Sequence, residues 1–350
     1  MVVKGWIHRA AIAGAIALPV LLSGCGLFSQ QSGKPIDPPQ VEVLDDVENP
    51  ETGEAVQEGT ETNLTVYLED GKGYLAPVAV NTTIASGEKA VVKALEMMTD
   101  NGPYAKQIPE GFRAMIPQGT EVKSYQFDKE RKVAIVDFSQ SFTDYNVKDE
   151  RKIVEAITWT LTAMTGIDGV EIWYEGAKLP EMPVDQYPLD HVLTRAIGIN
   201  LELAKGVSYA QSTPVTLYFS SQTANNEQYY VPVTRLVASG GNKTETVMKE
   251  LIAGPLNGKE LFSVITPDVE VKSIEQQDSI VAIDLLDETY YAGQKMHSEM
   301  LEAIVLSLTE NSDATEVKIT FNGESDFVDE KNNSYSEPVG RPHHVNAIKS

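Results

Sequence analysis

The chain contains an internal repeat with a period of about 150 residues. The sequence Glu121-Val122-Lys123-Ser124 recurs letter for letter as Glu270-Val271-Lys272-Ser273. In each copy an apolar segment follows, at residues 133–135 and 281–283, with an aspartate close behind it, Asp137 or Asp284. Two copies of this length are too few and too long for a solenoid of short repeats. The sequence therefore predicts two tandem, duplicated domains.

Within each copy, hydrophobic periodicity predicts the order strand, strand, helix, strand, strand, helix, strand. In the first copy, β-rich residues flank the turn sequence Asp70-Gly71-Lys72-Gly73, which predicts an opening hairpin. A helix should begin at Ser86 as its N-cap and end before Gly102-Pro103. A second hairpin is expected over 122–138, a longer helix over 149–164, and a last strand over 170–174.

This order predicts the fold class α+β. A helix that joins strands which are not hairpin neighbours covers one face of a small sheet, so each copy should be a two-layer sandwich. The other sheet face should remain in water or meet a partner. Asp137 and Asp284 end apolar strands and are expected to be exposed strand-end residues, with a shared functional role as the alternative.

Both copies end in a similar arm, which contains Arg195 with Ile199-Asn200 in the first copy and Arg341 with Val345-Asn346 in the second. Because the same pattern ends both copies, each arm is expected to pack on its own domain. Docking of a partner is the alternative. The predicted domains, each with its arm, are residues 62–205 and 206–350.

The N-terminus has the features of a lipoprotein signal. Lys4 and Arg9 precede about thirteen apolar or small residues, a run shorter than the roughly 20 that a transmembrane helix needs. Cys25, the only cysteine, directly follows Leu22, Ser23 and Gly24, which together form a lipobox. Residues 1–24 are therefore predicted to be removed, and a diacylglyceryl group on the Cys25 sulfur should anchor the chain to a membrane. Two acyl chains hold a protein stably on a bilayer, at about 0.8 kcal/mol per buried methylene.

Residues 25–61 are acidic and contain four prolines, with Lys34 as the only base. Few apolar residues and like-charge repulsion predict a disordered tether that holds the body away from the lipid. A role of this tether in binding a partner is the alternative to a passive spacer.

The formal charge is −23 for the whole chain, and removal of the signal with its two bases leaves −25. A surface this acidic makes nucleic acid a poor partner.

The search for catalytic motifs is negative. The chain has no Gly-x-Ser-x-Gly elbow, no phosphate loop and no His-Glu-x-x-His sequence. Lipidation would use the only thiol, which leaves no cysteine for catalysis or for a disulfide. His343 and His344 are adjacent in an extended arm, where their side chains point to opposite sides. We therefore predict no catalytic residue, no cofactor and no metal site. Aromatic residues near element ends are expected to be core, with interface anchoring as the alternative: Trp159, Trp173, Tyr174, Tyr229, Tyr230, Tyr290 and Tyr291.

The lipobox, the acidic tether and the two copies of Glu-Val-Lys-Ser with their Arg…Ile-Asn arms resemble the GerM-like sporulation and germination lipoproteins, which have tandem GerMN domains. The resemblance covers nearly the whole chain, but its motifs are structural. It implies a ring-building-motif-like fold, an αββαβ core with two helices on a three-stranded sheet, and an added β-hairpin in each copy. It also implies an anchor in the mother-cell membrane, facing the intermembrane space during sporulation.

The leading hypothesis is a non-catalytic envelope protein that supports spore formation, as a scaffold or component of the transenvelope channel complex between mother cell and forespore. Its partners would be other envelope or channel proteins, and self-association is left open. The alternative is a lipoprotein that binds or hydrolyses cell wall. A lipid-anchored solute-binding protein ranks last, because the copies lack the strand-helix alternation of doubly wound lobes.

Overall fold

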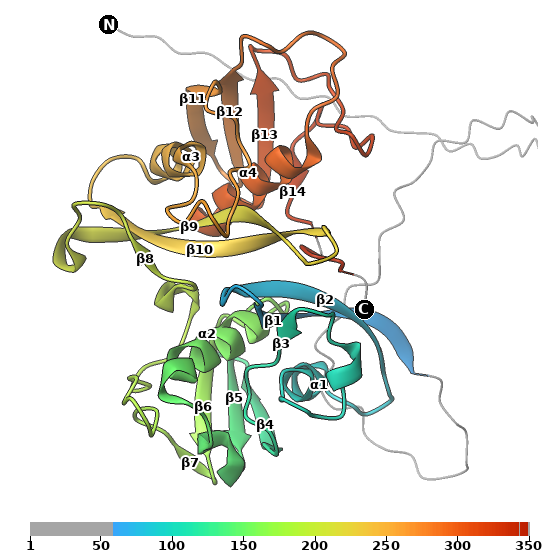
Figure 1. Ribbon diagram of the computed structural model, residues 1–350, viewed down its shortest axis with the longest axis vertical. Helices are drawn as coiled ribbons and strands as arrows, with labels where there is room; N and C mark the ends of the chain where they lie inside the picture. Colours follow the sequence, from blue (N-terminus) through green and yellow to red (C-terminus); the bar gives the residue numbers. More distant parts are fainter. Residues whose placement is uncertain (1–58, 343, 349–350) are drawn as a thin grey trace, which may run out of the picture. The chain divides into compact units, whose positions relative to one another are not determined.

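Each repeat is an α+β unit that opens with a long β-hairpin (Figure 1). The structure is a computed structural model that describes residues 59–342 and 344–348. These residues belong to one compact unit. The elements of the first repeat are β1 (Thr60–Asp70), β2 (Leu75–Ile84), α1 (Ala90–Met97), β3 (Phe112–Arg113), β4 (Val122–Asp128), β5 (Val133–Phe138), α2 (Glu150–Leu161), β6 (Gly169–Tyr174) and β7 (Ala177–Lys178).

The second repeat has the same order of long elements, after the short connecting strand β8 (Glu202–Leu203). Its elements are β9 (Ser212–Gln222), β10 (Gln228–Ala238), α3 (Lys243–Ala253), β11 (Glu270–Gln277), β12 (Ile280–Leu286), α4 (Ser298–Asn311), β13 (Glu316–Phe321) and β14 (Val339–Gly340). The predicted order of strands and helices is therefore confirmed in both copies, and so is the α+β class.

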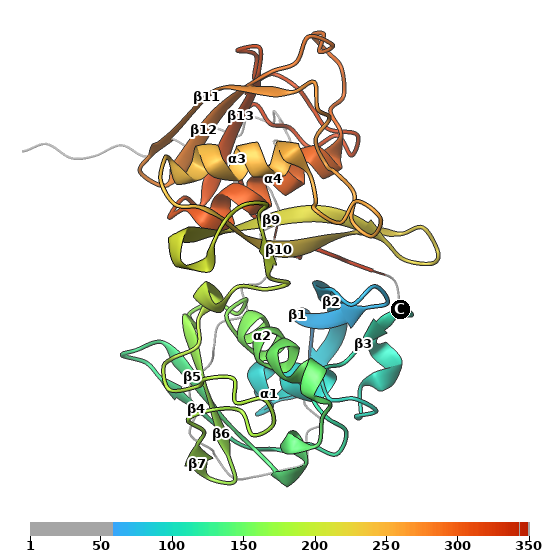
Figure 2. The same cartoon turned by 60° about the vertical axis from the view of Figure 1, so that its left-hand side comes forward.

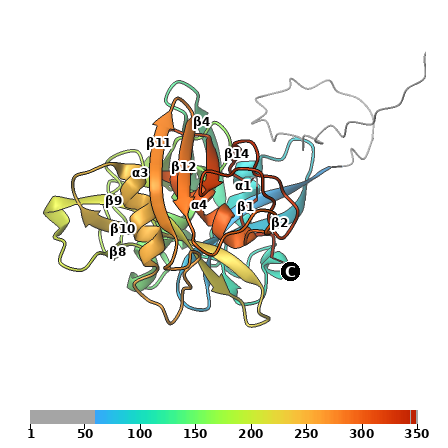
Figure 3. The ribbon, with the colours of Figure 1, turned by 90° about the horizontal axis from the view of Figure 1, so that it is seen from above.

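The core sheets have the order β4-β5-β6-β7 in the first repeat and β11-β12-β13-β14 in the second. In each sheet the first two long strands pair antiparallel, and the next pair is parallel and is joined through α2 or α4. Figure 3 shows β11 and β12 side by side when the protein is seen from above. Three long strands and one two-residue edge strand thus form each core sheet.

The hairpins add a layer on the side of the helices that faces away from the core sheet. The backbone N–H of Tyr67 in β1 donates to the Thr160 Oγ1 of α2 at 2.9 Å, and that of Tyr218 in β9 donates to the Ser307 Oγ of α4 at 3.0 Å. Figure 2 shows α3 and α4 between the β9–β10 hairpin and the sheet. The sandwich of helices and sheet has the predicted two layers, and the hairpin covers it as a third.

Helical periodicity identified the buried face of the long helices. Most of the residues expected on these faces are buried: Ile153, Ile157 and Leu161 in α2, and Leu301, Ile304, Val305 and Leu308 in α4. Met164, expected on the same face as Leu161, is half-buried and lies beyond the end of α2. The predicted cap of the first helix is wrong. α1 begins at Ala90, after Lys89, and no side chain caps it. Ser86 lies in the preceding turn, where Glu88 accepts a hydrogen bond from the Ala85 N–H at 2.9 Å.

The repeated aspartates at the strand ends have a structural role, and the expectation that Asp137 is exposed is wrong. Asp137 is buried, and its carboxylate accepts the N–H of Gly176 at 2.9 Å. Asp284 accepts the N–H of Gly323 at the same distance. Both glycines follow a residue with positive φ, so each carboxylate secures a left-handed turn after the last long strand.

Replacing Asp137 with Ala should lower the free energy of unfolding by about 1.5–3 kcal/mol, because the N–H of Gly176 loses a charged acceptor. Asp137→Asn should lower it less, since the amide oxygen still accepts. Asp168→Ala is the matched control, because that carboxylate is 65% exposed and pairs only with exposed Lys132. Urea unfolding monitored by circular dichroism measures all three variants. Equal loss in the Asp137→Ala and Asp168→Ala variants would show that the turn does not depend on this carboxylate.

Candidate functional site

The lipobox residues Leu22, Ser23, Gly24 and Cys25 lie outside the described residues, and so does His343. His191, His297 and His344 are exposed, and two of them pair with a single carboxylate: His191 with Asp190 at 2.8 Å and His297 with Glu330 at 3.1 Å. Residues 59–342 and 344–348 contain no group of three or more His, Asp or Glu side chains arranged to hold a metal ion. No helix in this part of the chain is long and apolar enough to cross a membrane.

The aromatic residues singled out in the sequence divide into three groups. Trp159, Tyr229 and Tyr230 are buried, as expected of core residues. Trp173, Tyr174 and Tyr290 are half-buried, and Tyr291 is 68% exposed. Trp159 and Tyr229 also contribute to the contact between the repeats, because Trp159 supports the first arm and the Tyr229 hydroxyl donates to Asp70 of the other repeat at 2.7 Å. Core and interface roles are therefore combined in these residues.

The first arm packs on its own helix α2. The Arg195 guanidinium lies over the Trp159 ring, 4.5 Å from its centroid, and its Nε donates to Thr162 Oγ1 at 3.1 Å. The Trp159 indole N–H donates to the Gly198 carbonyl at 2.9 Å. Gly198 has a φ of +78°, a left-handed conformation that suits glycine, and it packs closely against Thr234 of the second repeat.

The second arm repeats this arrangement on α4. The Arg341 guanidinium lies over the Tyr218 ring, 5.1 Å from its centroid, and its Nη1 donates to Thr309 Oγ1 at 3.3 Å. Thr160 of α2 and Ser307 of α4 accept hydrogen bonds from equivalent tyrosines and are therefore equivalent positions. Thr162 and Thr309 each follow two residues later, so they are equivalent as well. The two arms therefore use equivalent anchors, although the aromatic ring comes from a helix in one case and from a hairpin in the other.

Each arm also crosses to the other repeat through its asparagine. The Asn200 side chain accepts the N–H of Leu75 at 2.8 Å and donates to the carbonyl of Pro232, in the second repeat, at 2.7 Å. Asn346 does the same in reverse: it accepts the N–H of Tyr230 at 2.8 Å and donates to the carbonyl of Pro77, in the first repeat, at 2.7 Å. Pro77 and Pro232 are equivalent, because each lies opposite a tyrosine in its hairpin register. Exchanging the two repeats reproduces these hydrogen bonds, so the interface has approximate two-fold symmetry.

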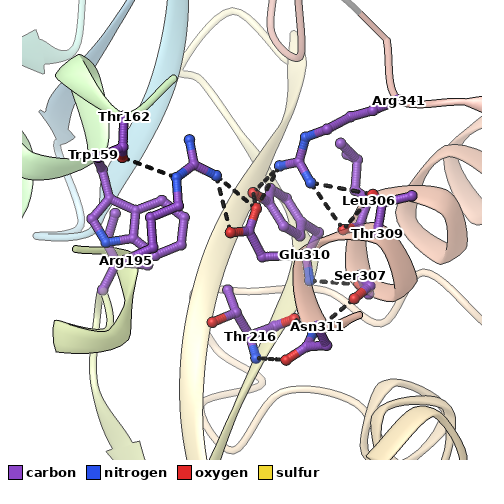
Figure 4. Close-up of polar contacts among 12 residues, drawn as sticks. Trp159, Thr162, Arg195, Thr216, Leu306, Ser307, Thr309, Glu310, Asn311 and Arg341 are labelled. Atoms are coloured by element: carbon purple, nitrogen blue, oxygen red, sulfur yellow. Dashed lines mark hydrogen bonds and ion pairs between the residues drawn. The ribbon is translucent and has the colours of Figure 1, made fainter. Parts of the chain in front are cut away.

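One carboxylate breaks this symmetry. Glu310, near the end of α4, accepts two hydrogen bonds from Arg195 Nη1, at 3.0 and 2.7 Å, and pairs with Arg341 Nη2 at 2.8 Å (Figure 4). The Tyr218 hydroxyl donates to the same carboxylate at 3.0 Å. The equivalent position on α2 is Ala163, which has no charge. The guanidinium groups of both arms therefore share a single carboxylate, and the second repeat supplies it.

The charges determine how this cluster behaves with pH. Burial alone raises the pKa of Glu310, but the two guanidinium groups and the Tyr218 hydroxyl more than offset it, so the pKa lies below its ordinary value of 4.5. A carboxyl with a lowered folded-state pKa stabilises the fold fully above the unfolded-state pKa, and this stabilisation is lost as the pH falls through the folded-state value. Burial raises the pKa of the Tyr218 hydroxyl well above its ordinary value. No group in the cluster is suited to proton transfer near neutral pH, so the arrangement acts as a clasp between the repeats.

Replacing Glu310 with Gln should leave two guanidinium groups at the interface without a counter-charge. The side chain of Glu310 is 7% exposed, and those of Arg195 and Arg341 are 25% and 27% exposed. Because water partly hydrates the two arginines, the free energy of unfolding should fall by roughly 2–4 kcal/mol, less than for a fully buried group. Both tryptophans of the described residues, Trp159 and Trp173, lie in the first repeat. In the Glu310→Gln variant, the urea unfolding transition monitored by tryptophan fluorescence should no longer coincide with the transition monitored by far-ultraviolet circular dichroism.

The matched control is Glu330→Gln, since the Glu330 side chain is 56% exposed and pairs only with His297. It should unfold like the wild type, with coincident transitions by the two probes. Coincident transitions and unchanged stability in the Glu310→Gln variant would contradict the assignment of this carboxylate as the clasp.

Comparison with known proteins agrees with this architecture. The family model described as Germane, for sporulation and spore germination, matches residues 65–180 and 216–326, one segment in each repeat. The spore germination protein GerM of Bacillus subtilis (strain 168) is 35% identical over 361 residues, which cover 96% of this chain and 97% of that protein. The solved structure of the tandem GerMN domains of the sporulation protein GerM from Bacillus subtilis matches with a TM-score of 0.75 and 35% identity. It covers 81% of this chain and 99% of its own.

The resemblance expected from the repeated words is therefore confirmed. A family match within each repeat, and a relative aligned over nearly its full length, agree with the duplicated fold. The chain belongs to the Germane family of sporulation and spore germination proteins and is built from tandem GerMN domains.

Proposed function

We propose that this protein is a lipid-anchored, non-catalytic scaffold that supports spore formation from the extracytoplasmic face of the mother-cell membrane. Its partners would be envelope proteins of the transenvelope channel complex that joins mother cell and forespore. Membership of a sporulation and germination family supports the process. The scaffold role and the anchor are our proposal.

The clasp between the repeats is the observation that carries the scaffold role. Arg195, Arg341 and Glu310 join the two repeats, and the crossing amides of Asn200 and Asn346 add hydrogen bonds on either side. Enzyme active sites between domains commonly need the domains to open and close. A clasp of this kind instead holds two surfaces at a fixed separation, which suits a protein that positions other proteins.

The anchor is supported by the sequence at the N-terminus. Leu22-Ser23-Gly24-Cys25 follows an apolar run of signal length, and the body supplies no membrane-spanning helix among its described residues. The acidic residues 25–61 would then separate the body from the bilayer, since like charges repel and extend a chain.

Replacing Cys25 with Ala should abolish lipid attachment, because the acceptor sulfur is lost. The variant should no longer be labelled by radioactive palmitate, and it should lack the mobility shift that follows removal of the signal. Ser23→Ala is the matched control, since it keeps a small residue beside the cleavage point and should be processed and labelled normally. Equal palmitate labelling of the Cys25→Ala variant and the wild type would rule out the proposed anchor.

The scaffold function is tested by crosslinking the tagged, lipidated protein in sporulating and in vegetative cells. Recovery of channel components only during sporulation, with spore yield reduced in a deletion strain, is the expected result. In the Glu310→Gln strain the spore yield should lie between those of the wild type and the deletion strain, because two loosely joined repeats would position partner proteins poorly. Wild-type spore yield after deletion, with the channel proteins still in place, would contradict the proposal. Release of muropeptides by the purified protein would favour a cell-wall hydrolase instead.

A further inference from the structure

The hairpin strand β2 presents a free edge beside the clasp. It pairs with β1 on one side only, in a sheet of order β2-β1-β3. On its other side the arms bind alternate residues: Asn200 bonds the backbone of Leu75, and Asn346 bonds the carbonyl of Pro77 and the N–H of Ala79. Successive backbone groups of a strand point to opposite edges. Asn81 and Thr83 therefore direct their N–H and C=O groups to the same edge as Leu75, Pro77 and Ala79.

The second arm pairs with this edge at Ala79. The Asn346 carbonyl accepts the Ala79 N–H at 2.8 Å, in the manner of a neighbouring strand. Ala347 and Ile348, which follow Asn346, line one groove together with Ala79 and Asn81. Among the described residues, no backbone hydrogen bond reaches the outer groups of Asn81 or Thr83. The groove is thus continuous with the interface that the arm makes with both repeats.

The groove is neutral. Its remaining walls come from Asn63, Val80, Gln107 and Pro109, and its volume of about 480 Å³ is within the range of small-ligand pockets. No charged side chain lines it, although the protein as a whole is strongly acidic.

We propose that the edge of β2 beyond Ala79 binds a short, uncharged, extended segment of a partner polypeptide. The segment would pair with the outer backbone groups of Asn81 and Thr83 as an added strand, continuing the pairing that Asn346 begins. An uncharged segment is required because a buried charge in this neutral groove would have no counter-charge. This inference goes beyond the scaffold function, and its test uses no sporulating cells.

The test is a selection of phage-displayed random octapeptides on the full, detergent-solubilised lipoprotein. Enriched peptides should be uncharged and rich in β-formers. Synthetic versions should shift the amide resonances of Asn81 and Thr83 in the wild type. Asn81→Pro removes the outward N–H together with the side chain, as at Pro77 on the same edge, and should weaken binding at least tenfold. Asn81→Ala keeps that N–H and should change affinity less than twofold. Thr83→Pro provides a second N–H deletion if the Asn81→Pro variant unfolds.

Several outcomes would overturn the proposal. These are no enrichment of peptides, enrichment of charged peptides, or equal binding to the Asn81→Pro and Asn81→Ala variants. Competition by a peptide of residues 51–58 would show that the tether of the same chain is the occupant. A concentration-dependent dimer that Asn81→Pro abolishes would show that a second copy is the occupant.

Discussion

The carboxylate of Glu310 is the interaction on which the joining of the two repeats depends. It accepts hydrogen bonds from the arm of the first repeat and pairs with the arm of the second, so each arm is held by a group that the other arm also uses. Two guanidinium groups this close would repel each other if the carboxylate were absent. Because Glu310 is nearly buried, its attraction to both arginines is screened less than that of an ion pair at the surface.

The asparagine bridges show why a duplicated domain can form such an interface. Asn200 and Asn346 each bond their own hairpin and then the proline carbonyl of the other hairpin. Each repeat thus contacts the other through equivalent residues. This is the geometry of an isologous dimer, formed here within one chain. The first arm lies in the segment that links the repeats, whereas the second arm follows the second repeat and reaches the edge of β2. The hydrogen bonds of the two asparagines therefore follow the two-fold symmetry, whereas the ion pairs of Glu310 do not.

Much of the fold could be predicted from the sequence, because the signals were local. The repeated words, the hairpin turn at Asp70 and the apolar faces of α2 and α4 each depend on residues close together in the chain. The cap at Ser86 was wrong because nearby Glu88 bonds the turn instead. The burial of Asp137 was missed because its partner, Gly176, lies a helix away in the sequence.

The clasp was only partly visible in the sequence. Arg195, Asn200, Arg341 and Asn346 were recognised as repeated arm residues, and their packing on their own repeats was expected. Their crossing contacts could not be derived, because those contacts depend on how two folded repeats meet. Glu310 was missed because it is one of many carboxylates and its counterpart, Ala163, breaks the repeat. A position where one copy has a charge and the other does not, next to a repeated arginine, is the signal that could have identified it.

The most direct measurement of the central claim is backbone ¹⁵N relaxation on the protein produced without residues 1–25. If the clasp joins the repeats, the amides of both core sheets should report one rotational correlation time, that of the whole body. Two shorter correlation times, one for each repeat, would show that the repeats tumble independently and would contradict the clasp.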